Sequence, residues 1–425
     1  MFQGLSLDQA PPFKAPARFF LTAPVFAILG GILIFFSDNL ANVSSPLTLA
    51  VLHFFTLGFM SMVMIGAMQQ MLPVLVGVRF PNPLLFATVI HIFLSMATLM
   101  FGMGFYLQEG DYLLGAAVFL LTGIGLFAGV TLYKLFEASF ESESVTAMKF
   151  SLISLFVTLM LGVYLLLGIG TSVIGEEFEK VLKIHGFFAF FGWTGLLIAG
   201  VSYQVIPMFF ITSEFNAKIK RYLALSVFIS LFIFSAGVIF GYDIFALLTL
   251  TLFGIFGVFS LMLLKNRKRK LFDITINYWF SSSFSLLIGV FLFAVNIFIG
   301  NDSLGWIAGA VLGYGFAIGL INGMLYKIIP FLSWFHISSR GFFDMPTMRE
   351  MIEEKNAKIQ FLFHLLALIS LILLPFIRME KFAAFFIISS NSYLLYNLWQ
   401  AFKIYLAYEN KKSPMEEFKN FGKKL

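Results

Sequence analysis

One four-residue pattern occurs three times in this chain, each time inside an apolar segment. Its order is Gly, seven residues, Gly, three residues, Gln or Lys, two residues, Pro. The second copy starts 134 residues after the first, and the third starts 123 residues after the second. A pattern repeated at such distances predicts three related units of about 130 residues each. The copies are Gly58/Gly66/Gln70/Pro73, Gly192/Gly200/Gln204/Pro207 and Gly315/Gly323/Lys327/Pro330.

The bulk composition excludes an ordinary soluble domain. The mean hydropathy is +0.92, and hydrophobic residues make up 60% of the chain against 12% charged residues. Apolar runs long enough to cross ~30 Å of hydrocarbon recur along the whole length. Backbone groups in lipid must pair within each segment, and the alternating dyads of an outer-membrane barrel are absent from the sequence. We therefore expect an all-α protein with a single polytopic membrane domain over residues 1–425.

Twelve transmembrane helices are predicted, and the connections between them are short. The longest connection runs from about Ser333 to Ala357 and is charged. The chain has no cysteine, so disulfides and thiolate metal sites are excluded. The helices are predicted over residues 18–37, 46–73, 84–106, 112–136, 147–170, 180–208, 219–240, 243–264, 273–299, 304–332, 358–377 and 382–406.

Lysine and arginine are unevenly divided between the two sides of the predicted bundle. With the N-terminus inside, the inner side carries 24 of the 28 basic residues. Because basic loops resist translocation, both termini are expected in the cytoplasm, in the inner membrane of a bacterium or archaeon. This bias also accounts for the net charge of +6 without nucleic acid as a partner. The outer side carries only Lys180, Lys183, Arg378 and Lys381.

Twelve helices over three copies of the pattern give four helices per unit, over approximately residues 18–136, 147–264 and 273–406. The pattern falls in the second helix of each unit, and its residues share one face at 100° per residue. Such a bare stripe lets a neighbouring helix or a flat ligand approach closely. Helix packing explains any single glycine, but the repeated stripe is expected to line a crevice between units. Four of its glycines are predicted to lie beside a bound cofactor: Gly58, Gly66, Gly192 and Gly200.

Two of the five histidines are the strongest candidates for a site. His53 and His185 share depth near the outer ends of equivalent helices, and their registers differ by two residues, or about 200°. Helices of two units that face one crevice need such an offset. Two neutral imidazoles are the axial ligands of a bis-histidine b-type heme. Copper or zinc on the same pair would have an incomplete coordination shell, and structural histidines bonded to backbone or serine remain the other interpretation.

Three histidines are predicted to lie near the inner side. His91 and His364 are on equivalent helices, the third and the eleventh, where they are either a second metal site or structural residues. His336 is expected in an inner loop at the membrane interface.

Three polar residues belong to the repeated pattern itself. Lys327 replaces the glutamine of the other copies and is expected to snorkel to the surface, with a proton path or an anion contact as the alternatives. Gln70 and Gln204 are expected to hydrogen-bond across the central helices.

The topology and the surroundings of the two histidines resemble subunit I of the heme-copper oxidases. That subunit has twelve helices in three arcs of four, with pseudo-threefold symmetry and a histidine in the outer part of the second helix. The chain is also similar to bacterial membrane proteins described as oxidase subunit I-like and to the nitric-oxide-response NnrS family. The stretches that carry the resemblance run from Leu52 through Pro73 and from His185 through Met208.

Several departures from the oxidase pattern bear on function. An active oxidase has a tyrosine four residues after the histidine of helix six, where this chain has Ala189 after His185. The adjacent histidines of helix seven and the paired heme ligands of helix ten are absent from this sequence. His53 matches a low-spin heme ligand by position and His185 a copper ligand. The resemblance thus implies a degenerate relative that does not reduce oxygen at a binuclear centre.

The leading hypothesis is an integral membrane hemoprotein with one b-type heme near the outer face, used for electron transfer or for binding nitric oxide or another small gas. Its environment would be membrane lipid, with a quinone or a cytochrome as electron donor. The alternative is a cofactor-free permease or channel that uses the glycine-lined crevices. A third hypothesis is an assembly or stress-response protein without chemistry of its own, and the sequence does not decide whether the chain is an enzyme.

Overall fold

The computed structural model describes residues 9–77, 79–138, 141–268, 270–271 and 273–415. Over these residues the only regular secondary structure is helical, and no β-strand is present. Within the same residues, eleven helical rods are long and apolar enough to cross a membrane. A twelfth rod, α15 (Glu380–Glu409), is as long as the others but more polar, with Asn391 and Asn397 buried in it. The protein is therefore an all-α, multi-pass membrane protein.

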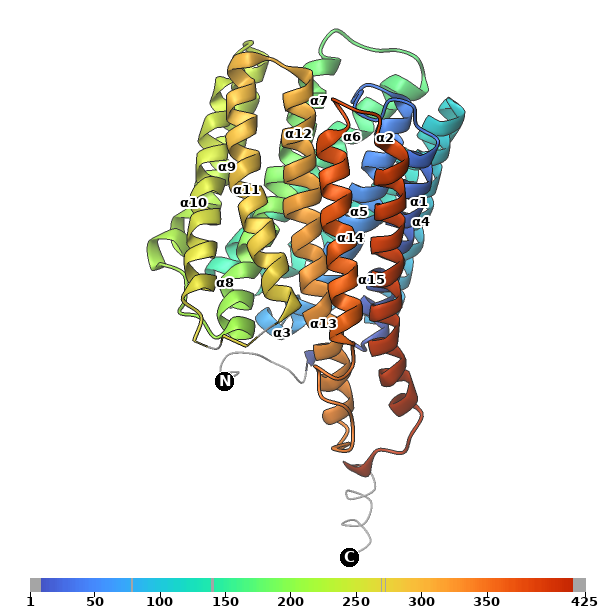
Figure 1. Cartoon of the computed structure of the whole chain (residues 1–425), viewed down its shortest axis with the longest axis vertical. Helices are drawn as coiled ribbons and strands as arrows, with labels where there is room; N and C mark the ends of the chain where they lie inside the picture. The colour runs from blue at the N-terminus through green and yellow to red at the C-terminus, as the bar shows by residue number, and fades with distance from the viewer. Residues whose placement is uncertain (1–8, 78, 139–140, 269, 272, 416–425) are drawn as a thin grey trace, which may run out of the picture.

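The rods follow one another in the order that the sequence predicts, four to each predicted unit (Figure 1). In each unit, the second rod is an α-helix, a π-helix and another α-helix in continuous succession. The first unit holds α1 (Lys14–Phe35), α2 (Pro46–His53), η2 (Phe54–Ser61), α3 (Met62–Val76), α4 (Pro83–Leu107) and α5 (Gly110–Glu137). The second holds α6 (Glu143–Gly170), α7 (Phe178–Phe187), η3 (Phe188–Gly195), α8 (Leu196–Phe210), α9 (Ala217–Ile239), η4 (Asp243–Phe245) and α10 (Ala246–Lys265). The third holds α11 (Ile274–Ile299), α12 (Asp302–Ala310), η5 (Val311–Ile318), α13 (Gly319–Ser338), α14 (Glu354–Leu373) and α15.

The three π-helices occupy the same position relative to the glycine pattern. Each is eight residues long and begins four residues before the first glycine of its copy: Gly58, Gly192 or Gly315. π-Helices are rare and are found mostly as short insertions at functional sites. The same uncommon structure at one register in three rods is what related units would produce.

The glycines of the pattern face the first helix of their own unit. A Cβ built on Gly58 would lie 2.5 Å from Phe26 Cβ, and one on Gly200 would lie 2.7 Å from Ala147 Cβ. The two residues that each first helix presents are seven positions apart in all three units, and they contact two glycines eight positions apart. They are Phe26 and Phe19 on α1, Ser154 and Ala147 on α6, and Ser285 and Tyr278 on α11.

This packing corrects the prediction that the glycine stripe lines a crevice. Gly58, Gly66, Gly192 and Gly200 were predicted to lie beside a cofactor, but side chains of α1 and α6 fill the space in front of them. Lipid offers no hydrophobic drive for helix association, so small residues that allow close van der Waals contact hold helices together. The glycines therefore join the first two helices of each unit.

The loop predicted between the tenth and eleventh helices is shorter than expected. α13 continues through Pro330 to Ser338, and α14 already begins at Glu354. His336 consequently lies in the last turn of α13, where its ring stacks on Phe13 with centroids 5.8 Å apart. The prediction of His336 as a loop residue is wrong, because the helix extends beyond the apolar segment that defined its predicted end.

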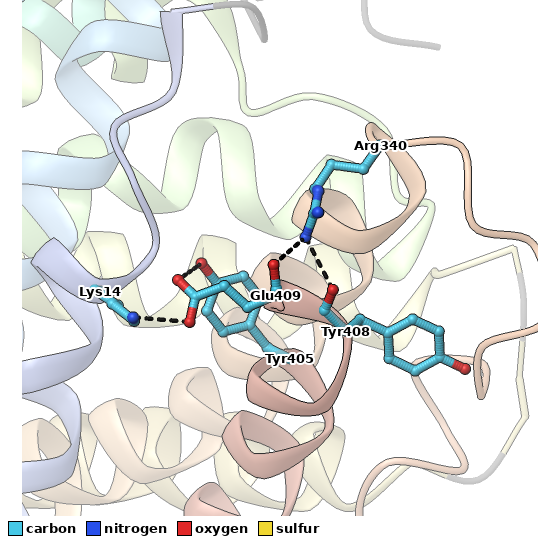
Figure 2. A network of polar contacts seen from close by, with 5 residues as sticks. All are labelled: Lys14, Arg340, Tyr405, Tyr408 and Glu409. Carbon is cyan, nitrogen blue, oxygen red and sulfur yellow. Dashed lines mark hydrogen bonds and ion pairs between the residues drawn. The ribbon is translucent and has the colours of Figure 1, made fainter. Parts of the chain in front are cut away.

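The first and last helices meet at one end of the bundle, which we call the basic end and define by Lys14, Lys327 and Arg340. Lys14 Nζ lies 2.7 Å from Glu409 Oε2, and the Tyr405 hydroxyl donates to the other Glu409 oxygen at 3.2 Å (Figure 2). The Arg340 guanidinium donates to the carbonyl oxygens of Tyr408, Glu409 and Lys411 at 2.9, 2.9 and 2.6 Å. A cation that binds the last carbonyls of a helix satisfies groups with no intrahelical partner. Arg340 thus ties α13 to α15 where both extend beyond the other rods (Figure 1).

The glycine contacts predict a defined cost for a single methyl group. Gly200→Ala places a Cβ 2.7 Å from a backbone-bound methyl that cannot rotate away, so α6 and α8 must separate. We expect a loss of about 1–3 kcal/mol, read as a lower unfolding temperature in detergent. Gly129→Ala is the matched control, because a Cβ at that position would meet no other atom within 4 Å. Equal stability of the two variants would contradict the packing described.

The Arg340 contacts predict local fraying rather than global unfolding. Arg340→Gln removes three charge-assisted hydrogen bonds from the end of α15. Backbone amides of residues 405–411 should exchange with deuterium at least about tenfold faster, since such bonds contribute about 1.5–3 kcal/mol. Arg221→Gln on α9 is the control and should leave α15 unchanged. Unaltered exchange in Arg340→Gln would show that other contacts hold this end.

Candidate functional site

His53 is the last residue of α2 and lies directly before η2. Its Nδ1 is 2.9 Å from the carbonyl oxygen of Leu49, one turn earlier, and its ring stacks on Phe101 of α4 with centroids 4.0 Å apart. A carbonyl only accepts hydrogen bonds, so the neutral ring carries its proton on Nδ1. Nε2 is left with its lone pair.

His185 on α7 also directs its Nδ1 at a backbone carbonyl, but at one on another helix. Its Nδ1 is 3.0 Å from the carbonyl oxygen of Thr158 on α6, which again places the proton on Nδ1. Gly162, one turn further along α6, makes room for the ring, because a Cβ there would lie 2.9 Å from His185 Cε1. α6 therefore both orients the imidazole and leaves its Nε2 lone pair free.

His53 and His185 lie on the second rods of the first and second units, His53 at the end of α2 and His185 near the end of α7. Both are half-buried, and neither Nε2 has a hydrogen-bond partner among the residues that the structure describes. Metal-bound histidines in proteins typically donate their other ring N–H to a backbone carbonyl or carboxylate. His53 and His185 therefore form a matched pair of neutral nitrogen donors near the end of the bundle opposite the basic end.

The other two intramembrane histidines are held by side chains of their own units. His91 Nε2 lies 2.9 Å from the Thr22 hydroxyl, between α4 and α1. His364 is fully buried in the third unit, with Nδ1 3.4 Å from the Asn322 amide and its ring stacked on Tyr314. Over the described residues no cluster of three or more His, Asp or Glu side chains could hold a metal ion. These contacts favour the structural interpretation of both histidines over a shared second metal site.

A buried polar cluster in the third unit was missed by the sequence analysis, which considered ionisable residues first. Gln360 is its centre: its Oε1 accepts from the Tyr278 hydroxyl and its Nε2 donates to Ser390 Oγ at 2.9 Å. The Asn397 amide donates to the Tyr326 hydroxyl at 2.9 Å. The sequence signal that could have revealed this cluster was the set of amide side chains inside the eleventh and twelfth helices, which includes Gln360 and Asn397. This cluster makes α15 compatible with the bundle despite its polarity.

Lys327 is paired with a carboxylate rather than extended to the surface. Its Nζ forms an ion pair with Asp273, which precedes α11 and also accepts from Thr275 N at 3.0 Å. The snorkelling, proton-path and anion-contact roles of Lys327 stay predictions, and the structure adds this ion pair within the chain. Both side chains are about one-quarter exposed, 24% for Lys327 and 25% for Asp273, so the pair is partly screened by solvent.

A cavity of about 170 Å³ lies between the second rods of all three units, in the half toward the basic end. Gln70 and Gln204 both line it, and Gln70 Oε1 is buried without a hydrogen-bond partner in the described part of the chain. The prediction that these amides bond across the central helices is thus wrong for this oxygen, because the cavity separates the rods there. The second rods therefore present glycines to their own units and this cavity to one another.

No family model matches the chain, and no curated protein matches it either.

The Asp273–Lys327 pair predicts a coupling that a double-mutant cycle measures. Lys327→Gln installs the residue of the other two copies and leaves the carboxylate without its cation. We expect a loss of about 1–2 kcal/mol, less than for a fully buried pair because solvent screens part of the charge. Asp273→Asn in the same chain should restore most of that loss in thermal unfolding. Strictly additive effects would mean that the two side chains do not interact.

Proposed function

We propose that this chain is an integral membrane hemoprotein whose architecture is related to subunit I of the heme-copper oxidases. One b-type heme is held between His53 and His185, near the end opposite the basic end. The observation that carries this proposal is the matched state of the two imidazoles. Each donates its Nδ1 proton to a backbone carbonyl, at 2.9 and 3.0 Å, and each leaves Nε2 free.

The two histidines fit the requirements of axial ligands. Heme iron needs neutral imidazoles, and a fixed Nδ1–H bond raises the basicity of the opposite nitrogen and holds the ring in place. The stack with Phe101 restrains the plane of the His53 ring, and Gly162 lets the His185 ring lie against α6. The pair comes from two units, so a ligand between them would link the first unit to the second.

The heme supplies one-electron redox chemistry when bound. Two histidine ligands favour electron transfer, with a quinone or a cytochrome as donor. Nitric oxide or another small gas could bind only if one of the two imidazoles left its position as a heme ligand. Oxygen reduction is not proposed, because Ala189 stands in place of the oxidase tyrosine and the other oxidase histidines are absent from the sequence.

The alternative is a cofactor-free permease or channel. Its predicted route along the glycine faces would be blocked by first-helix side chains such as Phe26 and Ala147. A permease would have to use the central cavity instead, which is the one observation in favour of this class.

Absorption spectra of the purified protein test the heme proposal. Protein expressed with sufficient heme should show a Soret band and a reduced α-band, and His53→Ala and His185→Ala should each lose at least about tenfold in heme affinity. His91→Ala and His336→Ala are the matched controls and should keep the spectrum. Colourless wild-type protein, or equal loss in all four variants, would refute the assignment and favour the permease.

A further inference from the structure

The central cavity is unusually rich in methionine. Five of its 23 lining residues are methionines, against 19 of 425 in the whole chain, which is about a fivefold enrichment. Methionine is a common gap-filler in apolar cores, but gap-filling alone gives no reason for concentration in one cavity. All three second rods contribute: Met64, Met68 and Met71 from α3, Met208 from α8 and Met324 from α13.

The five methionines form two levels along the axis of the bundle. Counted from the second glycine of each copy, Met64, Met68 and Met324 lie at positions −2, +2 and +1, within ~6 Å of one another in height. Met71 and Met208 lie at +5 and +8, closer to the basic end. The exposed fractions of the deeper three are 5%, 1% and 7%, while Met208 is 38% exposed. The three deeper methionines are thus buried, whereas Met208 also reaches the surface.

The chemistry of this lining selects for a soft monovalent cation. Thioethers prefer Cu(I), whereas hard or borderline divalent ions require carboxylates, imidazoles or thiolates. The lining has no ionisable side chain, and the chain has no cysteine. Methionine also has three rotatable bonds, so sulfur atoms from two helices can reach a common point in a cavity of about 170 Å³.

Other lining groups are compatible with a bound cation. The Trp279 ring forms part of the wall and is 1% exposed, and a tryptophan ring attracts cations through its π-face. Gln70 and Gln204 lie at position +4, between the two methionine levels. The side-chain oxygen of Gln70, Oε1, has no hydrogen-bond partner in the described part of the chain. An unpaired acceptor at this height can bind the water of an incoming ion.

We propose that the cavity is a Cu(I)-binding site formed by the thioethers of Met64, Met68 and Met324, with Met71 and Met208 at its opening. The ion binds as Cu(I) and no electron is transferred. Two of its three rods also carry the histidine pair, but the site shares no residue with that pair and does not depend on the heme.

Anaerobic competition between the purified full-length protein and the chromophoric chelator bicinchoninate tests the site. Wild-type protein should withdraw one equivalent of Cu(I). Met68→Leu with Met324→Leu keeps side-chain volume and should weaken binding at least about tenfold. Met96→Leu with Met103→Leu is the matched control, because these side chains are 41% and 44% exposed on α4, outside the cavity.

The histidine variants separate this proposal from the heme assignment. His53→Ala and His185→Ala should retain Cu(I) binding, whatever their heme spectrum shows. X-ray absorption of the copper-loaded protein should give a shell of sulfur scatterers. Absence of Cu(I) withdrawal, equal binding by the cavity and control variants, or loss of copper in the histidine variants would each overturn the thioether site.

Discussion

Close contact between the first and second helix of each unit is the constraint on which the rest of this structure depends. In lipid the association of helices relies on van der Waals contact, since apolar side chains gain little by leaving lipid hydrocarbon for one another. Six glycines provide that contact, and the residues opposite them keep the same seven-residue spacing on α1, α6 and α11. The second rods are thereby fixed around a common axis, each with its bare face turned toward its own unit.

On each second rod, the face that packs against the first helix is therefore different from the faces available to a ligand. The glycine face is used for packing, so a ligand can bind only away from the glycines. His53 lies against α4 and His185 against α6, both before the π-helices, and the methionines line the cavity toward the basic end. The ion pair of Lys327 with Asp273 and the contacts of Arg340 hold the third unit at that end. The two proposed sites therefore use different parts of the second rods.

The sequence was sufficient for the helices and their order, because apolar length and turn residues are local properties. The sequence did not predict the contacts between neighbouring rods. Placement of the stripe assumed 100° per residue, but η2 and η3 interrupt that periodicity, and nothing in the sequence shows which neighbour a glycine face contacts. The cluster around Gln360 was missed because its amides lie outside the repeated pattern, and nothing local in the sequence shows that they face one another. Methionines at positions 64, 68, 71, 208 and 324 could be recognised as a group only after the three rods were placed together.

The central claim is that two imidazoles from neighbouring units converge on one ligand. A side-chain-resolution density map of protein purified from heme-replete cells tests it most directly. The account predicts planar density between His53 and His185, with both Nε2 atoms directed at its centre and both Nδ1 atoms still bonded to the carbonyls of Leu49 and Thr158. Rings turned toward lipid, or Nε2 atoms paired with protein groups, would contradict it.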